Sequence, residues 1–195
     1  MFSRSLLSAS ILVGLLCNTV SSQSYCLDGD GLLCLTNWGV GRGNLTVHVQ
    51  CKPTPGQGGL AWCGFGINTG GNLTAWGMFP SSAWVLQVLA DNKTVVVEDR
   101  TIIAAARPAC YAQQLTYTLY SNIDANGVVT ASFTRPVVPG PAYQALGYPN
   151  ITDSKVPLVA AYACGEARTA GACGMDFAYH DQVFNNNTIN FLAAY

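Results

Sequence analysis

The sequence predicts an all-β protein, built as one antiparallel β-sandwich. Three observations predict this fold. Short β-prone segments recur along the chain, clusters of Gly, Pro and Asn separate them, and no long helical pattern, internal repeat or low-complexity tract interrupts the series. A chain of alternating strands and helices would show helical periodicity between its strands, so a parallel sheet is not indicated.

The most regular strand is predicted at 45–51, because Leu45, Val47, Val49 and Cys51 alternate with polar residues and share one face. His48 falls on the opposite face. Hairpin-like turns are expected at 90–93 and at 124–127, which ends in Asn-Gly. A short helical turn is expected within 104–114, and the stretch 136–149, with four prolines, is expected to be an irregular connection. The remaining strands are predicted at 60–67, 84–89, 94–97, 115–121, 128–134, 156–163 and 188–192.

Residues 1–22 are typical of a secretory signal peptide. Arg4 provides a positive start, an apolar core covers 6–16, and Ser21 and Ser22 offer small residues for cleavage. The apolar core is too short to cross a bilayer, and no further apolar run of about 20 residues follows. We therefore expect a secreted, extracellular protein with no membrane span, whose single domain covers 23–195.

Charged residues make up only 10% of the chain, and the formal net charge is −1. The chain has no basic stripe to neutralise phosphates, so nucleic acid is not an expected partner. Polar surface is instead expected from N-linked glycans on surface loops. Five Asn-X-Thr acceptor sequences occur, at Asn44, Asn72, Asn92, Asn150 and Asn186.

Eight cysteines occur, and because Cys17 lies in the leader, seven remain in the mature domain. An exported protein favours disulfides. Cys51 and Cys63 enclose a loop rich in Pro and Gly, and Cys164 and Cys173 enclose one rich in Gly and Ala. These are the two favoured bridges, although spacing alone leaves the connectivity open, and the odd number leaves at least one thiol over. No Cys-X-X-Cys pair indicates a zinc site.

Few side chains of the mature domain are suited to bind a transition metal through sulfur or imidazole nitrogen. Two methionines (Met78, Met175) and two histidines (His48, His180) remain after the leader. Met78 and His180 are both expected on loops, where a thioether and an imidazole could hold a haem iron from its two faces. As alternatives, Met78 fills a gap in the core and His180 is an ordinary loop histidine. His48 is expected to be solvated or in a cross-strand contact, and Met175 is not expected to be a ligand.

A series of fragments follows in a characteristic order. They are GLAWCGFG at 59–66, Gly77-Met78, AWVL at 83–86, VVVEDR at 95–100, a strand ending in Arg135-Pro136, and Tyr179-His180-Asp181. Their order and spacing resemble the DOMON superfamily, in particular the haem-binding cytochrome domain of cellobiose dehydrogenase and its stand-alone relatives. The resemblance covers most of the mature chain, from about Cys34 onward.

The resemblance implies an immunoglobulin-like sandwich that holds one non-covalent b-type haem, with Met78 and His180 as axial ligands of the iron. Such ligation fills all six positions of the iron, which implies transfer of single electrons rather than catalysis on a substrate. The absence of Cys-X-X-Cys-His agrees with non-covalent haem. We expect a separate electron donor, either a secreted flavin dehydrogenase or a small reductant. The expected acceptors are a copper-dependent polysaccharide oxygenase, a quinone or ferric iron. Whether the domain is also an enzyme in its own right stays open.

Two other interpretations remain open. A haem-free, secreted carbohydrate-binding β-sandwich module would stack polysaccharide on Trp38, Trp62, Trp76 and Trp84. A cysteine-rich structural or interaction protein would use the sandwich as a scaffold. A hydrolase has the least support, because the chain lacks GxSxG and HExxH sequences and has only two histidines for a triad.

Overall fold

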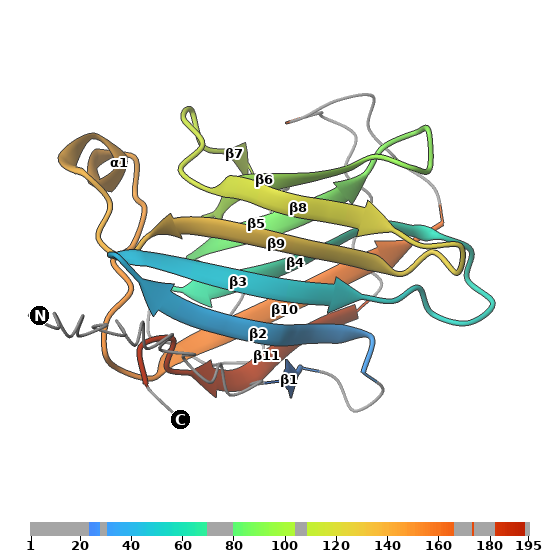
Figure 1. Cartoon of the computed structure of the whole chain (residues 1–195), viewed down its shortest axis with the longest axis horizontal. Helices are drawn as coiled ribbons and strands as arrows, with labels where there is room; N and C mark the ends of the chain where they lie inside the picture. Colours follow the sequence, from blue (N-terminus) through green and yellow to red (C-terminus); the bar gives the residue numbers. More distant parts are fainter. Residues whose placement is uncertain are drawn as a thin grey trace, which may run out of the picture.

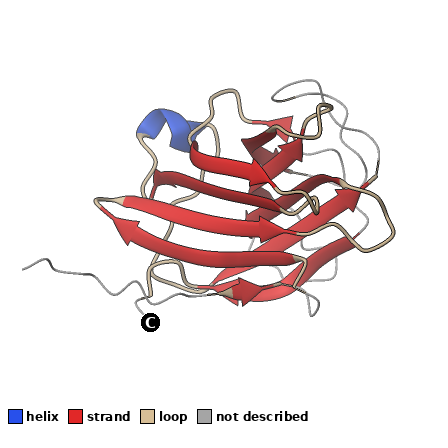
Figure 2. Ribbon diagram, turned by 45° about the vertical axis from the view of Figure 1, so that its right-hand side comes forward, coloured by secondary structure: helices blue, strands red, loops and turns tan. Residues whose placement is uncertain are grey.

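The computed structural model describes residues 24–27, 31–69, 80–103, 109–165, 173 and 182–193. These residues form two antiparallel β-sheets that lie face to face, with one short helix at an end of the sandwich (Figures 1 and 2). The elements are β1 (Tyr25–Cys26), β2 (Leu33–Gly41), β3 (Asn44–Cys51), β4 (Leu60–Asn68), β5 (Ser81–Val88), β6 (Val95–Ile102), β7 (Ala109–Cys110), β8 (Tyr117–Ile123), β9 (Val129–Pro136), α1 (Pro141–Ala145), β10 (Val156–Cys164) and β11 (Gln182–Ile189). The predicted all-β sandwich is confirmed.

The strands divide between a five-stranded sheet, in the order β1-β2-β3-β9-β8, and a six-stranded sheet, in the order β11-β10-β4-β5-β6-β7. In Figure 1 the five-stranded sheet lies in front of the six-stranded one. Neighbours such as β3 and β9, or β4 and β10, are far apart in sequence, so both sheets depend on long-range pairing. This layered arrangement gives each sheet one face toward the sandwich interior and one face away from it.

The main core lies between the two sheets. On β3 the residues Leu45, Val47, Val49 and Cys51 are buried and the residues between them are half-buried, as the alternation predicts. Trp84 of the six-stranded sheet contacts Phe133 of the five-stranded sheet, with ring centroids 5.2 Å apart. The apolar residues of both inner faces form one cluster, which supplies most of the hydrophobic stabilisation.

The structure corrects several predicted elements. The helical turn expected within 104–114 is wrong for the described residues, since 109–110 form β7 and 111–114 contain no helix. The connection 136–149 contains the short helix α1, which begins at Pro141, a residue suited to the first helical turn. The strand predicted at 188–192 lies at 182–189, because three consecutive asparagines hide its start from a search for apolar alternation. The strands β1 and β2 were not predicted.

Three disulfides link the described cysteines: Cys26–Cys34, Cys51–Cys63 and Cys110–Cys173. The Cys51–Cys63 bridge is the one that the sequence predicts. The predicted Cys164–Cys173 bridge is wrong, because Cys164 ends β10 and Cys173 is bonded to a cysteine of β7. Those two strands are separated by β4, β5 and β6, a distance of roughly 19 Å across the sheet.

The glycosylation candidates lie in different local structures. Asn92 is exposed in the turn between β5 and β6, and Asn150 is exposed after α1. Asn44 and Asn186 belong to strands β3 and β11, so the expectation of a surface loop is wrong for them. Asn72 lies outside the described residues. Use of any of these acceptors stays a prediction.

The turn between β5 and β6 makes a pH-dependent prediction. The Asp91 carboxylate accepts hydrogen bonds from the backbone N–H groups of Lys93 (2.9 Å) and Thr94 (2.8 Å) and from the Thr94 hydroxyl (2.5 Å). The Thr94 hydroxyl and then these two N–H groups lower the pKa of Asp91 to about 2. Because the pKa is depressed, the stabilisation is complete above the unfolded value of about 3.9 and is lost as the pH falls through about 2.

Replacing Asp91 by alanine is therefore expected to lower the urea midpoint modestly at pH 7, with a difference from wild type that shrinks as the pH falls from about 4 toward 2. Urea titrations at several pH values measure this difference. The Asp91→Asn variant, which cannot ionise, serves as a control. An Ala-to-wild-type difference that is equal at pH 6 and pH 2 would contradict the assignment.

Candidate functional site

The six-stranded sheet is buried on its outer face as well as on its inner face. A sheet at the surface of a sandwich usually turns polar residues toward water on that side. Here a second apolar cluster, separate from the main core, occupies the outer face of β4, β5, β6 and β10. We call this surface the outer platform; its buried members are Ala61, Trp62, Ala83, Val85, Ile102, Ala161 and Ala163.

Small residues keep the centre of the outer platform flat. Gly66 pairs with Ala83 on one side and with Val159 on the other. A Cβ atom placed on Gly66 would lie 2.8 Å from Val159 Cγ2 and 3.3 Å from Ala83 Cβ, so a larger residue would displace its neighbours. Gly64 has the same orientation two residues earlier. A flat, buried, apolar surface of this kind suits a flat, apolar ligand.

A buried polar cluster borders the outer platform on β5 and β6. Glu98 pairs with Val85 of the platform, and its Oε2 accepts hydrogen bonds from Gln87 Nε2 at 3.0 Å and from Arg100 Nε at 2.8 Å. Arg100 Nη2 lies 2.6 Å from the same oxygen and completes an ion pair. Both side chains are at most 4% exposed, so each charge depends on the other for its stability. The platform therefore has one charged, rigid margin.

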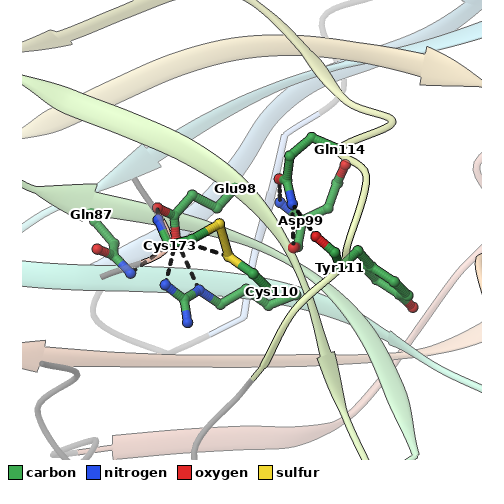
Figure 3. Close-up of polar contacts among 8 residues, drawn as sticks. Gln87, Glu98, Asp99, Cys110, Tyr111, Gln114 and Cys173 are labelled. Carbon is green, nitrogen blue, oxygen red and sulfur yellow. Dashed lines mark hydrogen bonds and ion pairs between the residues drawn. A yellow bond between two sulfur atoms is a disulfide. The ribbon is translucent and has the colours of Figure 1, made fainter. Parts of the chain in front are cut away.

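The Cys110–Cys173 disulfide lies against this cluster, as Figure 3 shows. The backbone N–H of Cys173 donates to Glu98 Oε1, and Cys110 Sγ lies 4.0 Å from Glu98 Oε2. Among the described residues, these three are the group whose ligand atoms are close enough to hold a metal ion. However, both sulfurs are consumed in a disulfide and cannot act as thiolates. The contact instead fixes position 173 beside β6.

The predicted iron ligands Met78 and His180 lie outside the described residues, as does Met175. Their neighbours in the chain are described. Met78 precedes Ser81, the first residue of β5, by three positions, and His180 precedes Gln182, the first residue of β11, by two. Both candidates are thus connected to strands of the six-stranded sheet, the sheet that carries the outer platform. Their role as ligands stays a prediction.

The structure places His48 in the other layer. It lies on β3 of the five-stranded sheet, pairs with Asn37 and Ser132, and faces away from the sandwich core. The whole sandwich separates it from the outer platform. This position agrees with the predicted cross-strand location of His48 and leaves it too far from the platform to share a ligand there.

The tryptophan surface proposed for glycan stacking is wrong for the described residues. Trp38, Trp62 and Trp84 are 8%, 5% and 2% exposed, so none offers a ring face to a polysaccharide. Trp38 and Trp84 belong to the main core, and Trp62 belongs to the outer platform. Trp76 lies outside the described residues.

The platform and its charged margin are not apparent from the sequence alone. In the sequence, Gly64 and Gly66 lie within the strand predicted at 60–67, and Glu98 and Arg100 lie within the VVVEDR fragment, with no sign of a shared surface. One usable signal is present: glycines at alternate positions of a strand remove every side chain from one face, which indicates a close approach there.

Within the described part of the chain, no helix is long and apolar enough to cross a membrane. No protein-family model matches the sequence, and no curated protein matches it.

Solved structures do resemble the chain. The cytochrome domain of Myriococcum thermophilum cellobiose dehydrogenase superposes with a TM-score of 0.60 at 12% identity, over 88% of this chain and 84% of that one. The cytochrome b domain of pyranose dehydrogenase from Coprinopsis cinerea gives a TM-score of 0.53 at 14% identity, over 76% of this chain and 68% of that one. The chain therefore shares the β-sandwich fold of these cytochrome domains.

Proposed function

We propose that this chain is a secreted b-type haem protein that transfers single electrons between an extracellular donor and acceptor, with Met78 and His180 as the axial ligands. The observation that carries the proposal is the outer platform: a flat, buried, apolar face on a sandwich of the cytochrome fold. A porphyrin needs such a face, because most of its surface is apolar and planar.

The described residues fit this group. The platform is apolar throughout, and Trp62 and Ile102 add large apolar side chains to its alanines. When bound, haem supplies one-electron redox chemistry, with a potential that depends on its axial ligands and on the polarity around it. The platform residues would exclude water from the haem. The ion pair of Glu98 and Arg100 would provide fixed charges at the margin of the platform. The ligand assignment itself rests on the sequence resemblance.

The first test is an absorption spectrum of protein produced with haem supplied. We expect a Soret band and the ferrous α and β bands of low-spin, six-coordinate iron, and no shift on adding carbon monoxide at rest. The His180→Ala variant is expected to lose stable haem binding, whereas His48→Ala should keep the wild-type spectrum because His48 lies in the other sheet. A colourless protein that ignores added haemin would refute the proposal, and equal haem loss from both variants would refute the ligand assignment.

The second test concerns electron flow. Donors of the proposed type are a secreted flavin dehydrogenase or a small reductant, and acceptors are a copper-dependent polysaccharide oxygenase, a quinone or ferric iron. Stopped-flow mixing should show fast reduction by such a donor, fast reoxidation by such an acceptor and slow reoxidation by oxygen alone. Rapid carbon monoxide binding by the ferrous protein would show an open iron position and contradict Met78 as ligand.

A further inference from the structure

The outer face of the five-stranded sheet is half-buried at its centre and exposed along β8, and it carries a regular array of uncharged polar residues. Strand register sets the array, since residues that pair across antiparallel strands share one face. Three rows cross from β8 through β9 and β3 to β2: Tyr117-Thr134-Thr46-Gly39, Tyr120-Ser132-His48-Asn37 and Asn122-Thr130-Gln50-Cys34. Four strands at about 4.8 Å spacing give this surface a width of roughly 14 Å.

The composition of these rows is unusual for a solvated sheet face. None of the paired residues is Asp, Glu, Lys or Arg, whereas each row carries three side chains with a hydroxyl or an amide group. Thr46 and Thr134 already form a hydroxyl pair at 3.3 Å across two strands. A ligand recognised here would have to be uncharged and rich in hydrogen-bonding groups.

Two exposed tyrosines stand at one side of the array. Tyr117 is 69% exposed and Tyr120 is 54% exposed, both on the edge strand β8. Their partners on β9, Thr134 and Ser132, are two residues apart, so the two rings lie about 7 Å from each other along the strand. Large aromatic side chains left in water on a flat face mark a binding surface. Their ring faces attract the C–H groups on the flat side of a pyranose sugar.

A hollow lies at the other side of the array. It has a volume of about 290 Å³ and is lined in part by Asn37, Gly39, Gly41, Thr46 and His48. The two glycines of β2 contribute no side chains, which opens the hollow beside Thr46 and His48. Thr46 and His48 therefore offer a hydroxyl and an imidazole to a ligand in the hollow.

We infer that this face binds an uncharged polysaccharide chain. The chain would stack sugar rings on Tyr117 and Tyr120 and extend across the hydroxyl-bearing rows toward the hollow, where its hydroxyl groups reach Thr46 and His48. Stacking supplies the apolar contact, and the Thr, Ser and His side chains supply hydrogen bonds, some of them through water. This surface is distinct from the outer platform, because it belongs to the opposite face of the sandwich (Figure 1). Polysaccharide binding and haem binding therefore do not compete.

The test uses the full secreted protein, before and after enzymatic removal of its N-glycans. Probes are microcrystalline cellulose, insoluble xylan and chitin in sedimentation assays, with cellohexaose in calorimetry and polygalacturonate as the charged comparison. We expect binding to at least one uncharged polymer and no binding to polygalacturonate. The Tyr117→Ala/Tyr120→Ala variant should bind at least about tenfold more weakly than wild type, and Thr46→Val should also bind more weakly than wild type. Ile103→Ala, which removes an exposed apolar side chain just after β6, beyond the other sheet, should bind like wild type.

Several outcomes would overturn the inference. One is wild-type protein that binds none of the uncharged polymers, and another is a double tyrosine variant that binds as well as wild type while its thermal unfolding is unchanged. Binding by the deglycosylated protein alone would instead support the inference, with a glycan of the protein itself, such as one on Asn44 of the same sheet, covering the face. A wild-type dimer that the double variant converts to monomer would assign the tyrosines to self-association.

Discussion

Replacing Asp99 by alanine is expected to lower the free energy of unfolding by about 3 kcal/mol or more. Asp99 is 1% exposed, and its carboxylate joins β6 to the segment that precedes β8. Oδ2 accepts hydrogen bonds from the backbone N–H groups of Leu115 and Thr116, each at 2.7 Å, and from the Tyr148 hydroxyl at 3.0 Å. Oδ1 accepts one from the Thr116 hydroxyl at 2.5 Å. Alanine would leave the backbone N–H and the hydroxyl of Thr116 without this acceptor, at about 1–3 kcal/mol each. The Leu115 N–H and the Tyr148 hydroxyl would keep only their second partners, the Tyr148 hydroxyl oxygen at 3.2 Å and the Gln113 carbonyl oxygen at 2.8 Å.

The loss extends to a buried cation. Arg135 is 2% exposed and donates from Nη2 to the carbonyl oxygen of Pro149 at 2.6 Å. Burial lowers the pKa of the Arg135 guanidinium, and the charge of Asp99 opposes that shift. Without the carboxylate, the positive charge stays buried with less compensation. Burial, followed by the charge of Asp99, raises the pKa of Tyr148, so its hydroxyl remains a neutral donor at any physiological pH.

Urea unfolding measures this prediction, with Asp124→Ala as a matched control. Asp124 also accepts two backbone N–H groups, those of Asn126 (2.8 Å) and Val128 (2.9 Å), but it lies in an exposed hairpin turn where water can replace the carboxylate. We expect the Asp99 variant to lose several times more stability than the control. The Asp99→Asn variant should recover little of the lost stability, because its NH2 group is a hydrogen-bond donor and the groups that surround it are also donors. A loss for Asp99→Ala no greater than that for Asp124→Ala would contradict this account.

The sequence predicts the sandwich because its inner faces follow simple alternation. On β3, where one face is buried and the other is open, the apolar residues alone identify the strand and the side of each residue. The same rule fails on β6, which was predicted to end at 97 but continues to Ile102. There Glu98, Asp99 and Arg100 are buried by specific hydrogen bonds that apolar periodicity does not reveal. Polar residues that are buried through partners distant in sequence are the main source of such errors.

Prediction of the candidate site was limited for a related reason. Met78 and His180 stand out by residue type and by resemblance, whereas the platform depends on which strands are neighbours. Ala83, Ala161 and Gly66 come from three separate strands, and only the order β10-β4-β5 brings them together. The prediction of a Cys164–Cys173 bridge was wrong for the same reason. The two cysteines are close in sequence, but the strand order places them far apart across the sheet. Long-range pairing is decided by the whole chain and leaves little trace in any single segment.

Removing the Cys110–Cys173 disulfide by a double change to serine is expected to lower the free energy of unfolding by about 4 kcal/mol. The bridge spans a sequence separation of 63, so it constrains a large part of the unfolded chain. It also fixes Cys173 against the buried Glu98 carboxylate, seven positions before His180. If His180 binds haem iron as proposed, the double variant should therefore release haem faster than wild type as well as unfold more easily.

The matched control is the Cys26→Ser/Cys34→Ser variant, whose bridge has a sequence separation of only 8 and joins the short strand β1 to β2 in the other sheet. Its loss of stability is expected to be smaller, about 2.5 kcal/mol, with an unchanged rate of haem release. Double variants are needed because a single change would leave an unpaired thiol able to exchange with other disulfides. Urea unfolding gives the stability, and transfer of haem to apomyoglobin gives the release rate. Equal release rates in the two double variants would show that the bridge beside Glu98 stabilises the fold without helping to position the haem ligand.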